Sequence, residues 1–484
     1  MQRIVLVVIL AVAAAARLWF LHAGIPHAVG IDEPQVIGRS LAILRSGDWN
    51  PHIFDYPTLV IYLHAAIAIA RFLLGAVRGE WNSLDAFAVD AVYETGRVVA
   101  ALIGVLTVYL TYRLARELSG RPAATLAAAL LAVHPLHVRE SHFILTDVPM
   151  VMLTTLALWL AVRAARRRDT TAYAWAGALC GLAAAAKYTG GVVLIAPLAA
   201  WAIGERAAAD RWRKLAAIVG AAAVAFLAGA PYTVLDMPAF LDGFAAQFAR
   251  FAGPPRGAEP AWLTYLKHLS PSWGRASVPL AIAGMLILLT RAGARRAAIP
   301  VIAFALAFFY VVATHSLVFG RYALPLVPVV CIMSAVAVLA LAGYVRRFGP
   351  LRRPAPAAAL LVAVLAGLLW PPAAVAVRWL DQYKEAETRT LAADWLKANA
   401  PKGARVATEN SGPTYLDAAG FRVAPTELLL DHPIDWYRSR VDFLVISSAD
   451  LSRYGDYLTA GPTVFQIAPT SQRWGPPIRV VRLK

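Results

Sequence analysis

The first 380 residues alternate long apolar stretches with short polar connections. A helix that crosses a bilayer needs about 20 predominantly apolar residues, and eleven stretches reach or approach that length. They are residues 4–22, 97–117, 122–138, 143–163, 172–187, 188–203, 214–232, 277–291, 297–314, 321–344 and 356–376. The pattern predicts a mainly α-helical, polytopic membrane protein with about eleven transmembrane helices.

Five of the polar connections are strongly basic. They comprise residues 113–121, 163–168, 205–214, 291–296 and 346–353. Short cytoplasmic loops of membrane proteins carry an excess of Lys and Arg, so we place all five loops, and the N-terminus, in the cytoplasm. Residues 1–22 could also pass for a signal peptide, but an uncleaved first helix agrees better with this loop pattern.

Residues 56–77 are apolar enough to be a twelfth span, yet a full crossing there would move every later basic loop to the outside. The segment that follows is acidic, which is typical of an external loop. We therefore expect residues 56–77 to form a juxtamembrane or re-entrant helix on the outer face.

The external side then carries the loops 23–96 and 233–276 and everything after about residue 380. The last part has the composition of a soluble domain: "TLAADWLKANAPKG" and "DLSRYGDYL" predict helices, and "ARVATE", "VDFLVISS" and "IRVVRL" predict strands. We divide the chain into a transmembrane catalytic domain, residues 1–380, and a small extracytoplasmic α/β domain, residues 381–484. The aromatic and basic loop 233–276 could contact an acceptor or lipid headgroups, but an amphipathic helix resting on the membrane fits it better.

Composition supports this assignment. Of the 484 residues, 59% are hydrophobic and 15% are charged, whereas soluble domains average about 25% charged residues. The net charge of +17 is explained by the basic loops, because no basic stripe with interleaved aromatics indicates nucleic-acid binding. Cys180 and Cys331 both lie in apolar stretches, which indicates neither a disulfide framework nor a Cys-based metal site.

Two adjacent carboxylates follow the first apolar stretch, in "GIDEPQVIGRS". Asp32 could simply be the N-cap of a short amphipathic helix, with Pro34 in its first turn and Gly47 as its end. That role explains one acid but not the second, Glu33. From these residues alone, a capping role and a catalytic role have equal support.

A third acid, Asp147, lies at the outer end of the fourth apolar stretch, with Glu140 and His142 close by in sequence. An ionisable residue at membrane depth indicates a functional site by default. Asp147 could alternatively cap its helix or pair with Arg139.

Cationic side chains fall on the same predicted face. Lys187 lies at the tight outer turn of "AAAAKYTGG", and His315 and Arg321 bracket another outer turn. Arg39 follows Asp32 by about two helical turns. A single snorkelling Lys or Arg would mean little, but several cations facing carboxylates indicate an anionic substrate with a reactive centre, such as a lipid phosphate.

The order and spacing of several motifs resemble the GT-C membrane glycosyltransferases, in particular the family of protein O-mannosyltransferases and bacterial lipid A aminoarabinose transferases. The motifs are "IDEPQVIGRSLAIL", "YPTLVIYLHA", "GRVVAALIGVLTVYLTYRLARELSGR", "HFILTDVPMVM", "AAAAKYTGG" and "GRYALPLVP". They run through most of residues 1–345, and the start of the C-terminal domain resembles the external lobe of bacterial members.

The resemblance implies a polyprenyl-phosphate-linked monosaccharide as donor and an inverting reaction on the non-cytoplasmic face of a bacterial plasma membrane. Asp32 matches the base that takes the acceptor proton, Glu33 belongs to the same motif, and Asp147 matches the second acidic motif. Lys187, Arg321 and Tyr322 match positions near the lipid phosphate. The chain departs from the family at "YPT", where a second proline is usual, and at "DEPQ", where an aromatic pair often follows the acids.

We therefore expect Asp32, Glu33 and Asp147 to be catalytic, and Lys187, Arg321, Tyr322, His315 and Arg39 to bind the donor phosphate. Tyr56 and His142 are candidates for contact with acceptor or lipid. No cofactor is required, although a divalent metal between Asp32 and Asp147 is an alternative. No His/Cys ligand spacing indicates zinc.

The expected acceptor is a hydroxyl or phosphate of a protein, lipid A, another glycolipid or a polysaccharide. The main alternative function is a transporter or flippase of a lipid-linked or anionic solute. Transporters tend to show paired halves with charges near the midplane, and the sequence contains no internal repeat. A scaffold without enzymatic activity leaves the clustered acids unexplained.

Overall fold

The computed structural model describes residues 2–30, 32–205, 208–253, 259–269, 276–345, 347, 354–426 and 428–484. The chain forms two compact units. Unit 1 comprises Met1–Leu18, Arg39–Ile69 and Arg97–Ala376, and unit 2 comprises Trp19–Gly38, Ala70–Gly96 and Val377–Lys484. The C-terminal region therefore belongs to the same unit as two segments from the first hundred residues. The sequence-based domain boundary at residue 380 stays a prediction.

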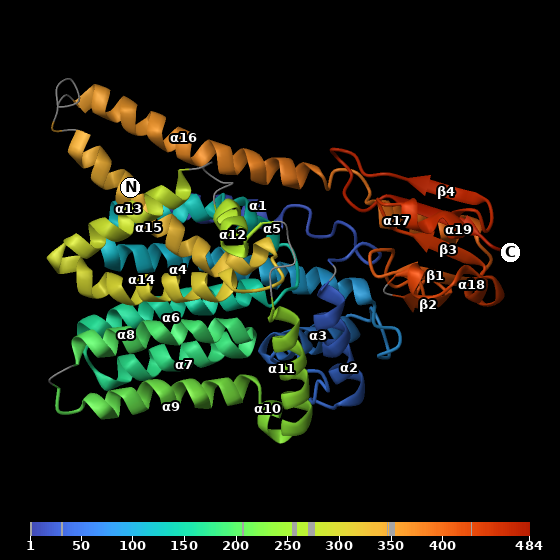
Figure 1. Ribbon diagram of the computed structural model, residues 1–484, viewed down its shortest axis with the longest axis horizontal. Helices are drawn as coiled ribbons and strands as arrows, with labels where there is room; N and C mark the ends of the chain where they lie inside the picture. Colours follow the sequence, from blue (N-terminus) through green and yellow to red (C-terminus); the bar gives the residue numbers. More distant parts are fainter. Residues whose placement is uncertain are drawn as a thin grey trace. The chain divides into compact units, whose positions relative to one another are not determined.

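The chain up to residue 381 is mainly helical (Figure 1), and α2, α3, α4 and α16 each contribute residues to both units. The helices of the N-terminal half are α1 (Gln2–Leu18), α2 (Glu33–Ser46), α3 (Leu59–Val77), α4 (Val89–Ala132), α5 (Pro135–Glu140), α6 (Asp147–Arg167), α7 (Thr170–Ala186), the 3-10 helix η1 (Tyr188–Leu194) and α8 (Ile195–Gly204). They continue as α9 (Arg211–Gly229), α10 (Tyr232–Leu235), α11 (Met237–Phe251), α12 (Ala261–Leu269), α13 (Ser277–Thr290), α14 (Ala292–Ala313), the 3-10 helix η2 (Gly320–Leu326), α15 (Val327–Val345) and α16 (Pro354–Asp381). The prediction of a mainly α-helical membrane protein is confirmed.

Several predicted spans have different bounds in the structure. The pair 97–117 and 122–138 belongs to α4, which breaks at Ser119 and Gly120, and its second arm ends at Ala132. Gly120 has a φ of 80°, a left-handed conformation that glycine adopts without steric cost. The predicted spans 188–203 and 321–344 each begin with a 3-10 helix, because Gly and Pro interrupt the regular helical pattern at these points.

Seven helical segments in the described part of the chain are long and apolar enough to cross a membrane. One of them is α3, which the sequence predicts to be juxtamembrane. Two shorter apolar helices, Tyr188–Gly204 and Ser277–Thr290, add to these seven. The count of eleven spans and the juxtamembrane position of α3 stay predictions.

Small residues allow the helices of unit 1 to pack closely. A Cβ atom on Gly181 of α7 would lie 2.0 Å from the carbonyl oxygen of Ala222 in α9, so only glycine permits this approach. Small residues at helix contacts are characteristic of membrane proteins, where close van der Waals packing drives association.

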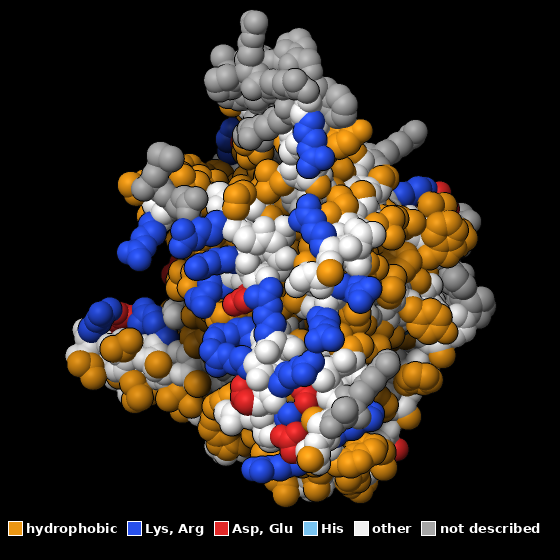
Figure 2. Space-filling model, turned by 90° about the vertical axis from the view of Figure 1, so that its left-hand side faces the viewer, with side chains coloured by type: hydrophobic (Ala, Val, Ile, Leu, Met, Phe, Trp, Pro, Cys, Tyr) orange, Lys and Arg blue, Asp and Glu red, His pale blue; other side chains and the backbone are white. Residues whose placement is uncertain are grey.

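Basic side chains gather at one end of unit 1. The connections α6–α7, α8–α9 and α13–α14 lie at this end in Figure 1, and Figure 2 shows Lys and Arg side chains spread over it. Arg113, Arg116 and Arg163 line one hollow on this face. The predicted basic loops 113–121, 163–168 and 291–296 thus share a face, while most of 346–353 and part of 205–214 lie outside the described residues.

The C-terminal part of unit 2 is a five-stranded sheet with helices. Its elements are α17 (Thr388–Asn399), β1 (Arg405–Glu409), β2 (Arg422–Thr426), the 3-10 helix η4 (Leu429–Asp431), α18 (Ile434–Arg440), β3 (Phe443–Ile446), the 3-10 helix η5 (Ser452–Tyr454), α19 (Gly455–Leu458), β4 (Thr463–Ile467) and β5 (Ile478–Arg482). The strand order is β2-β1-β3-β5-β4. Strands β2, β1 and β3 are parallel, and β5 is antiparallel to both neighbours.

The small α/β domain predicted from the sequence is confirmed, together with its three predicted strands. Successive residues of β1 belong to different hydrophobic clusters on the two faces of the sheet. Val406 is in the cluster that contains Leu396 of α17, and Ala407 is in the cluster that contains Tyr437 of α18. This alternation is the period of a strand buried on both faces. Strands β2 and β4 and helix α18 were not predicted from the sequence.

Candidate active site

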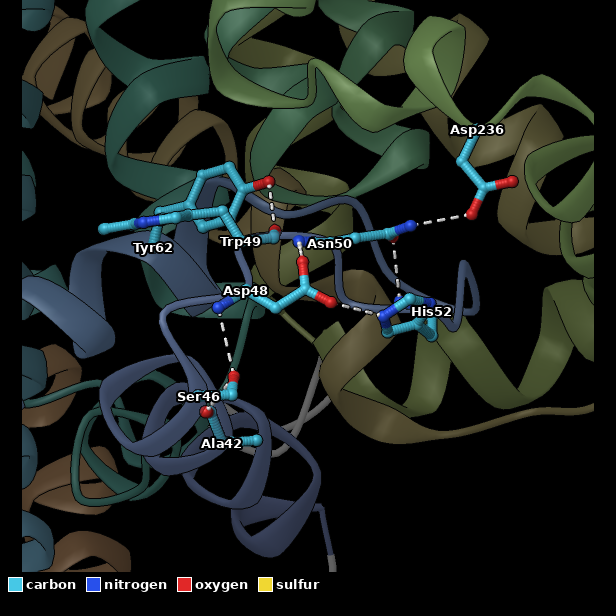
Figure 3. A network of polar contacts seen from close by, with 8 residues as sticks. All are labelled: Ala42, Ser46, Asp48, Trp49, Asn50, His52, Tyr62 and Asp236. Carbon is cyan, nitrogen blue, oxygen red and sulfur yellow. Dashed lines mark hydrogen bonds and ion pairs between the residues drawn. The ribbon is translucent and has the colours of Figure 1, made fainter.

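The loop between α2 and α3 is held by a network of polar contacts (Figure 3). His52 Nε2 lies 2.7 Å from Asp48 Oδ2, and the backbone N–H of Asn50 donates to Asp48 Oδ1 at 2.8 Å. The Asn50 side chain in turn donates to Asp236 Oδ2, just before α11, at 2.8 Å. These contacts tie the loop to the start of α11 and so help to fix the position of Asp55 and Tyr56, which follow it.

A cavity of about 470 Å³ in unit 1 brings five of the predicted site residues together: Tyr56, Asp147, Lys187, His315 and Tyr322. Its apolar wall comes largely from phenylalanine side chains, namely Phe244, Phe248 and Phe251 of α11 and Phe308 of α14. The cavity therefore combines charged groups with an extended apolar surface.

Asp147 is the centre of the charged cluster. Its Oδ1 lies 2.7 Å from Lys187 Nζ, and its Oδ2 lies 4.0 Å from Arg321 Nε. The three residues come from different elements: Asp147 is the first residue of α6, Lys187 is the extended residue that ends α7, and Arg321 lies in η2. The backbone breaks at η1 and η2 thus place both cations beside one carboxylate.

The cluster is largely removed from water. The Asp147 side chain is 3% exposed, that of Lys187 is 13% exposed and that of Arg321 is 23% exposed. A buried charge requires a partner of opposite sign, and Asp147 provides one for two cations. Lys187 Nζ also lies 4.6 Å from the centre of the Tyr322 ring, a cation–π contact. The cluster keeps a formal charge of +1, which suits an anion.

His315 has a different electrostatic character from its neighbours. Burial lowers the pKa of His315, and the charge of Lys187 lowers it further. The imidazole ring lies 5.0 Å from the ring of Phe251. Both effects favour the neutral imidazole in the protein without substrate, and the role of His315 in binding the donor phosphate stays a prediction.

Asp32 and Glu33 belong to unit 2. Glu33 is fully buried, and its Oε2 accepts a hydrogen bond from the backbone N–H of Gly30 at 2.7 Å. Asp32 directly precedes α2, at the N-cap position, and lines a second cavity of about 530 Å³ that also includes Gln35 and Tyr415. Both acids are thus held in structured surroundings within unit 2.

The chain just before these acids is bound by the C-terminal part of unit 2. Thr414 donates from its backbone N–H to the His27 carbonyl at 3.0 Å and from its hydroxyl to the Pro26 carbonyl at 2.6 Å. Arg389 donates to the Val29 carbonyl at 3.0 Å. These contacts span almost four hundred residues of sequence and fix the segment that leads into Asp32.

Residues 88–234 match the model of the dolichyl-phosphate-mannose-protein mannosyltransferase family. This range contains Asp147 and Lys187. Among solved structures, the chain is similar to ArnT from Cupriavidus metallidurans, crystallised with undecaprenyl phosphate, with a TM-score of 0.64 and 17% identity over 99% of this chain and 98% of that chain. The Archaeoglobus fulgidus oligosaccharyltransferase gives a TM-score of 0.62 and 15% identity over 94% of this chain and 70% of that chain.

The chain has the GT-C fold of these membrane glycosyltransferases. No curated protein sequence matches it.

Some predicted site residues lie away from the cavity of unit 1. Arg39 does not line it; burial lowers the pKa of Arg39, and the nearby charge of Asp55 opposes this shift. His142 is buried, and its Nδ1 lies 2.8 Å from the Val138 carbonyl oxygen. The alternative roles for Asp147 are both wrong, because Thr146 occupies the N-cap of α6 and Arg139 pairs with Glu140.

The geometry gives little support to a metal at Asp147, since a divalent ion there would have to displace Lys187. Within the described ranges, no group of three or more His, Cys, Asp or Glu residues is arranged to hold a metal ion. We derive no step of the reaction through a metal.

Sequence reasoning missed part of the cavity of unit 1. Asp55 and Tyr188 both line it, and the Tyr188 hydroxyl donates to the Phe54 carbonyl at 3.0 Å. The position of Asp55 next to Tyr56, a predicted site residue, could have indicated that it also lines the cavity. The Phe wall of α11 was visible as an aromatic, amphipathic pattern in the loop 233–276, but the sequence alone did not indicate which surface it faces.

Proposed function

We propose that this protein is a glycosyltransferase that moves a monosaccharide, with inversion, from a polyprenyl-phosphate donor to a hydroxyl or phosphate acceptor. The observation that carries the proposal is the pair of Asp147 and Lys187 in a cavity with a phenylalanine wall, with Arg321 beside Asp147. A lipid phosphate needs cations, and an isoprenoid chain needs an apolar surface. The solved neighbours support this choice: the ArnT structure contains undecaprenyl phosphate, and an archaeal oligosaccharyltransferase was solved in complex with an inhibitory peptide and a dolichol-phosphate.

On the donor side, the phosphate gains negative charge as the bond to the sugar breaks. Fixed cations in a partly dry site stabilise that charge more than water does, because they do not have to reorient during the reaction. We assign this role to Lys187 and Arg321, with Tyr322 and neutral His315 as hydrogen-bonding partners. Asp147 holds the two cations in place between reaction cycles.

On the acceptor side, a sugar or serine hydroxyl is too weak an acid to ionise at neutral pH. A positioned general base contributes typically 10²–10⁴-fold in rate, and we assign this role to Asp32, with Glu33 fixing its backbone. The acceptor oxygen bonds to the anomeric carbon while the bond from that carbon to the phosphate oxygen breaks. The proton passes to the Asp32 carboxylate, and the electron pair leaves with the lipid phosphate.

The cavity is proposed to face away from the cytoplasm. Asp147 starts α6, whereas Arg166 and Arg167 lie in its last turn. A helix of 21 residues is about 30 Å long, so the cluster and the basic loops lie at opposite ends of one bilayer-spanning element. With the basic face inside, as the positive-inside rule requires, the reaction takes place on the extracytoplasmic side of a plasma membrane.

The test compares the wild type with Asp32→Asn in nanodiscs, using polyprenyl-phosphate sugars labelled in the sugar and membranes of the expressing cell as acceptor. We expect the wild type to release free polyprenyl phosphate, and Asp32→Asn to lose transfer by at least about 100-fold while still binding the donor. Full activity of Asp32→Asn would contradict its role as base. Movement of intact donor across vesicles without release would favour a flippase.

A further inference from the structure

The second cavity, which contains Asp32, differs in charge from the donor cavity. Its lining includes three carboxylates, from Asp32, Glu409 and Asp417, and one guanidinium, from Arg389. Arg389 pairs with Glu387 at 2.9 Å. Because Glu387 does not line the cavity, the guanidinium charge is neutralised without any of the three lining carboxylates. In the donor cavity, the carboxylates of Asp55 and Asp147 are balanced by Lys187 and by Arg321 beside Asp147, whereas this cavity carries excess negative charge.

The fold also marks this cavity as a binding site. Strand β2 pairs with one edge of β1. The chain then passes through α18 and returns as β3, which pairs with the opposite edge of β1. In sheets with parallel strands, ligands bind beyond the carboxyl ends of the strands at such a reversal of strand order. Thr408, Glu409 and Asn410, at the carboxyl end of β1, line the cavity at this point.

Glu409 stabilises this end of the sheet and is not a candidate ligand contact. Its carboxylate accepts from the backbone N–H groups of Leu429 at 3.1 Å and Ser447 at 2.9 Å. It also accepts from the Tyr454 hydroxyl at 2.6 Å and the Ser447 hydroxyl at 3.1 Å. The cavity therefore has a rigid floor, and the polar side chains suited to a ligand are Asp32, Gln35, Asn410 and Asp417.

We propose that this cavity binds the acceptor and that the acceptor presents a neutral, hydroxyl-rich sugar to Asp32. The inference rests on the proposed function, since it takes Asp32 as the base, and a base must lie within hydrogen-bond reach of the proton it removes. Sugar hydroxyls both donate and accept, which matches carboxylate and amide side chains. A phosphate beside two or more carboxylates would be repelled, so the cavity selects against phosphorylated acceptors.

The inference narrows the reaction to the formation of a glycosidic bond. The acceptor hydroxyl oxygen bonds to the anomeric carbon, its proton goes to Asp32 and the lipid phosphate departs with the electron pair. Transfer to an acceptor phosphate, which would give an acid-labile glycosyl phosphate, is excluded.

The binding test uses hydrogen–deuterium exchange of residues 408–417 in the full chain, which needs no turnover. The probes are neutral tetrasaccharides of mannose, glucose and galactose, and the same compounds with a terminal phosphate. We expect at least one neutral probe to slow exchange, and its phosphorylated form to bind about tenfold more weakly, equivalent to 1.4 kcal/mol. Equal or tighter binding of the phosphorylated probes, or no effect of any neutral probe, would overturn the proposal.

Two variants locate the site. Asn410→Ala and Asp417→Asn should each weaken the effect of the neutral probe, and Asp417→Asn should also reduce the discrimination against phosphate. The matched control is Asp456→Asn, an exposed acid in α19 outside the cavity, which should behave as the wild type. An effect of the control as large as that of Asp417→Asn would count against the site.

Failure here is separable from failure of the proposed function. Release of polyprenyl phosphate without neutral-sugar binding at 408–417 would overturn the acceptor site alone. Neutral-sugar binding with no release from any donor would overturn the proposed transfer and leave the binding site standing.

Discussion

The pair formed by Lys187 and Asp147 is the residue-level feature on which the donor site depends. The sequence predicted both residues, because a charge at membrane depth is costly and is kept only for a reason. It could not predict their contact, which joins residues forty positions apart across two helices. Nor could it show that Arg139, adjacent to Glu140, is engaged locally and leaves Asp147 to Lys187 and Arg321.

Replacing Lys187 by Met should remove one partner of a nearly buried carboxylate. We expect a loss of about 3 kcal/mol in stability, at the lower end for a broken buried pair, because Arg321 remains near Asp147. The double variant Asp147→Asn, Lys187→Met should recover most of this loss but still bind undecaprenyl phosphate poorly. Thermal unfolding in detergent and lipid binding measure the two effects, and wild-type lipid affinity in the double variant would contradict the assignment.

His315 provides a pH test of the donor site. Burial and Lys187 lower its pKa in the protein without substrate, and a bound phosphate should raise it. His315 then holds its proton more tightly in the donor-bound state, so donor affinity should increase as the pH falls. The measurement runs from pH 8 to pH 5.5, because both values lie about one unit or more from the ordinary histidine pKa. The donor should be a sugar-linked phosphodiester, because a phosphate monoester has a second ionisation of its own that would add to the pH dependence of binding. His315→Gln should flatten the profile, and an unchanged profile would exclude this group.

At the scale of elements, the breaks in the helices are as informative as the helices themselves. The sequence predicted spans at 188–203 and 321–344, whereas the structure begins each with a 3-10 helix beside Lys187 or containing Arg321. Hydropathy is insensitive to this difference because the residues stay apolar. The signals were the glycines of "YTGG" and the Gly and Pro of "GRYALP", and short 3-10 segments are common at the ends of α-helices.

In the C-terminal sheet, Glu409 should be the most sensitive single residue of β1. It is 3% exposed and accepts from two backbone and two hydroxyl groups. In Glu409→Gln, one acceptor oxygen becomes an NH₂ group that faces donors, so we expect a loss of about 2–3 kcal/mol. Faster deuterium exchange in residues 443–458 would show it, with the exposed Asp435→Asn as control. Equal exchange in the two variants would refute this structural role.

At the scale of the whole molecule, the arrangement of charge was predictable and the composition of the units was not. The basic loops were predicted to share a side, and the described ones do share a face (Figure 2). Unit 2, however, takes in Trp19–Gly38 and Ala70–Gly96 as well as the C-terminal region. No local pattern reveals this, because the hydrogen bonds from Thr414 to Pro26 and His27 join the two ends of the sequence.

Orientation can be tested with single cysteines in a Cys180→Ala, Cys331→Ala background. Arg167→Cys and Arg295→Cys, both on the basic face, should react with a membrane-impermeant maleimide only from the cytoplasmic side. Lys402→Cys, exposed in the C-terminal region, should react only from the outside. Reaction of all three from the same side would reject the proposed topology.

The central claim, that the cavity of unit 1 holds a lipid phosphate, is tested most directly by photo-crosslinking. An undecaprenyl-phosphate analogue with a diazirine next to the phosphate would be irradiated with the purified chain and the labelled peptides identified by mass spectrometry. We predict labelling within residues 187–191 and 315–322 that excess undecaprenyl phosphate suppresses. Labelling confined to other parts of the chain, or labelling that excess lipid does not suppress, would contradict the claim.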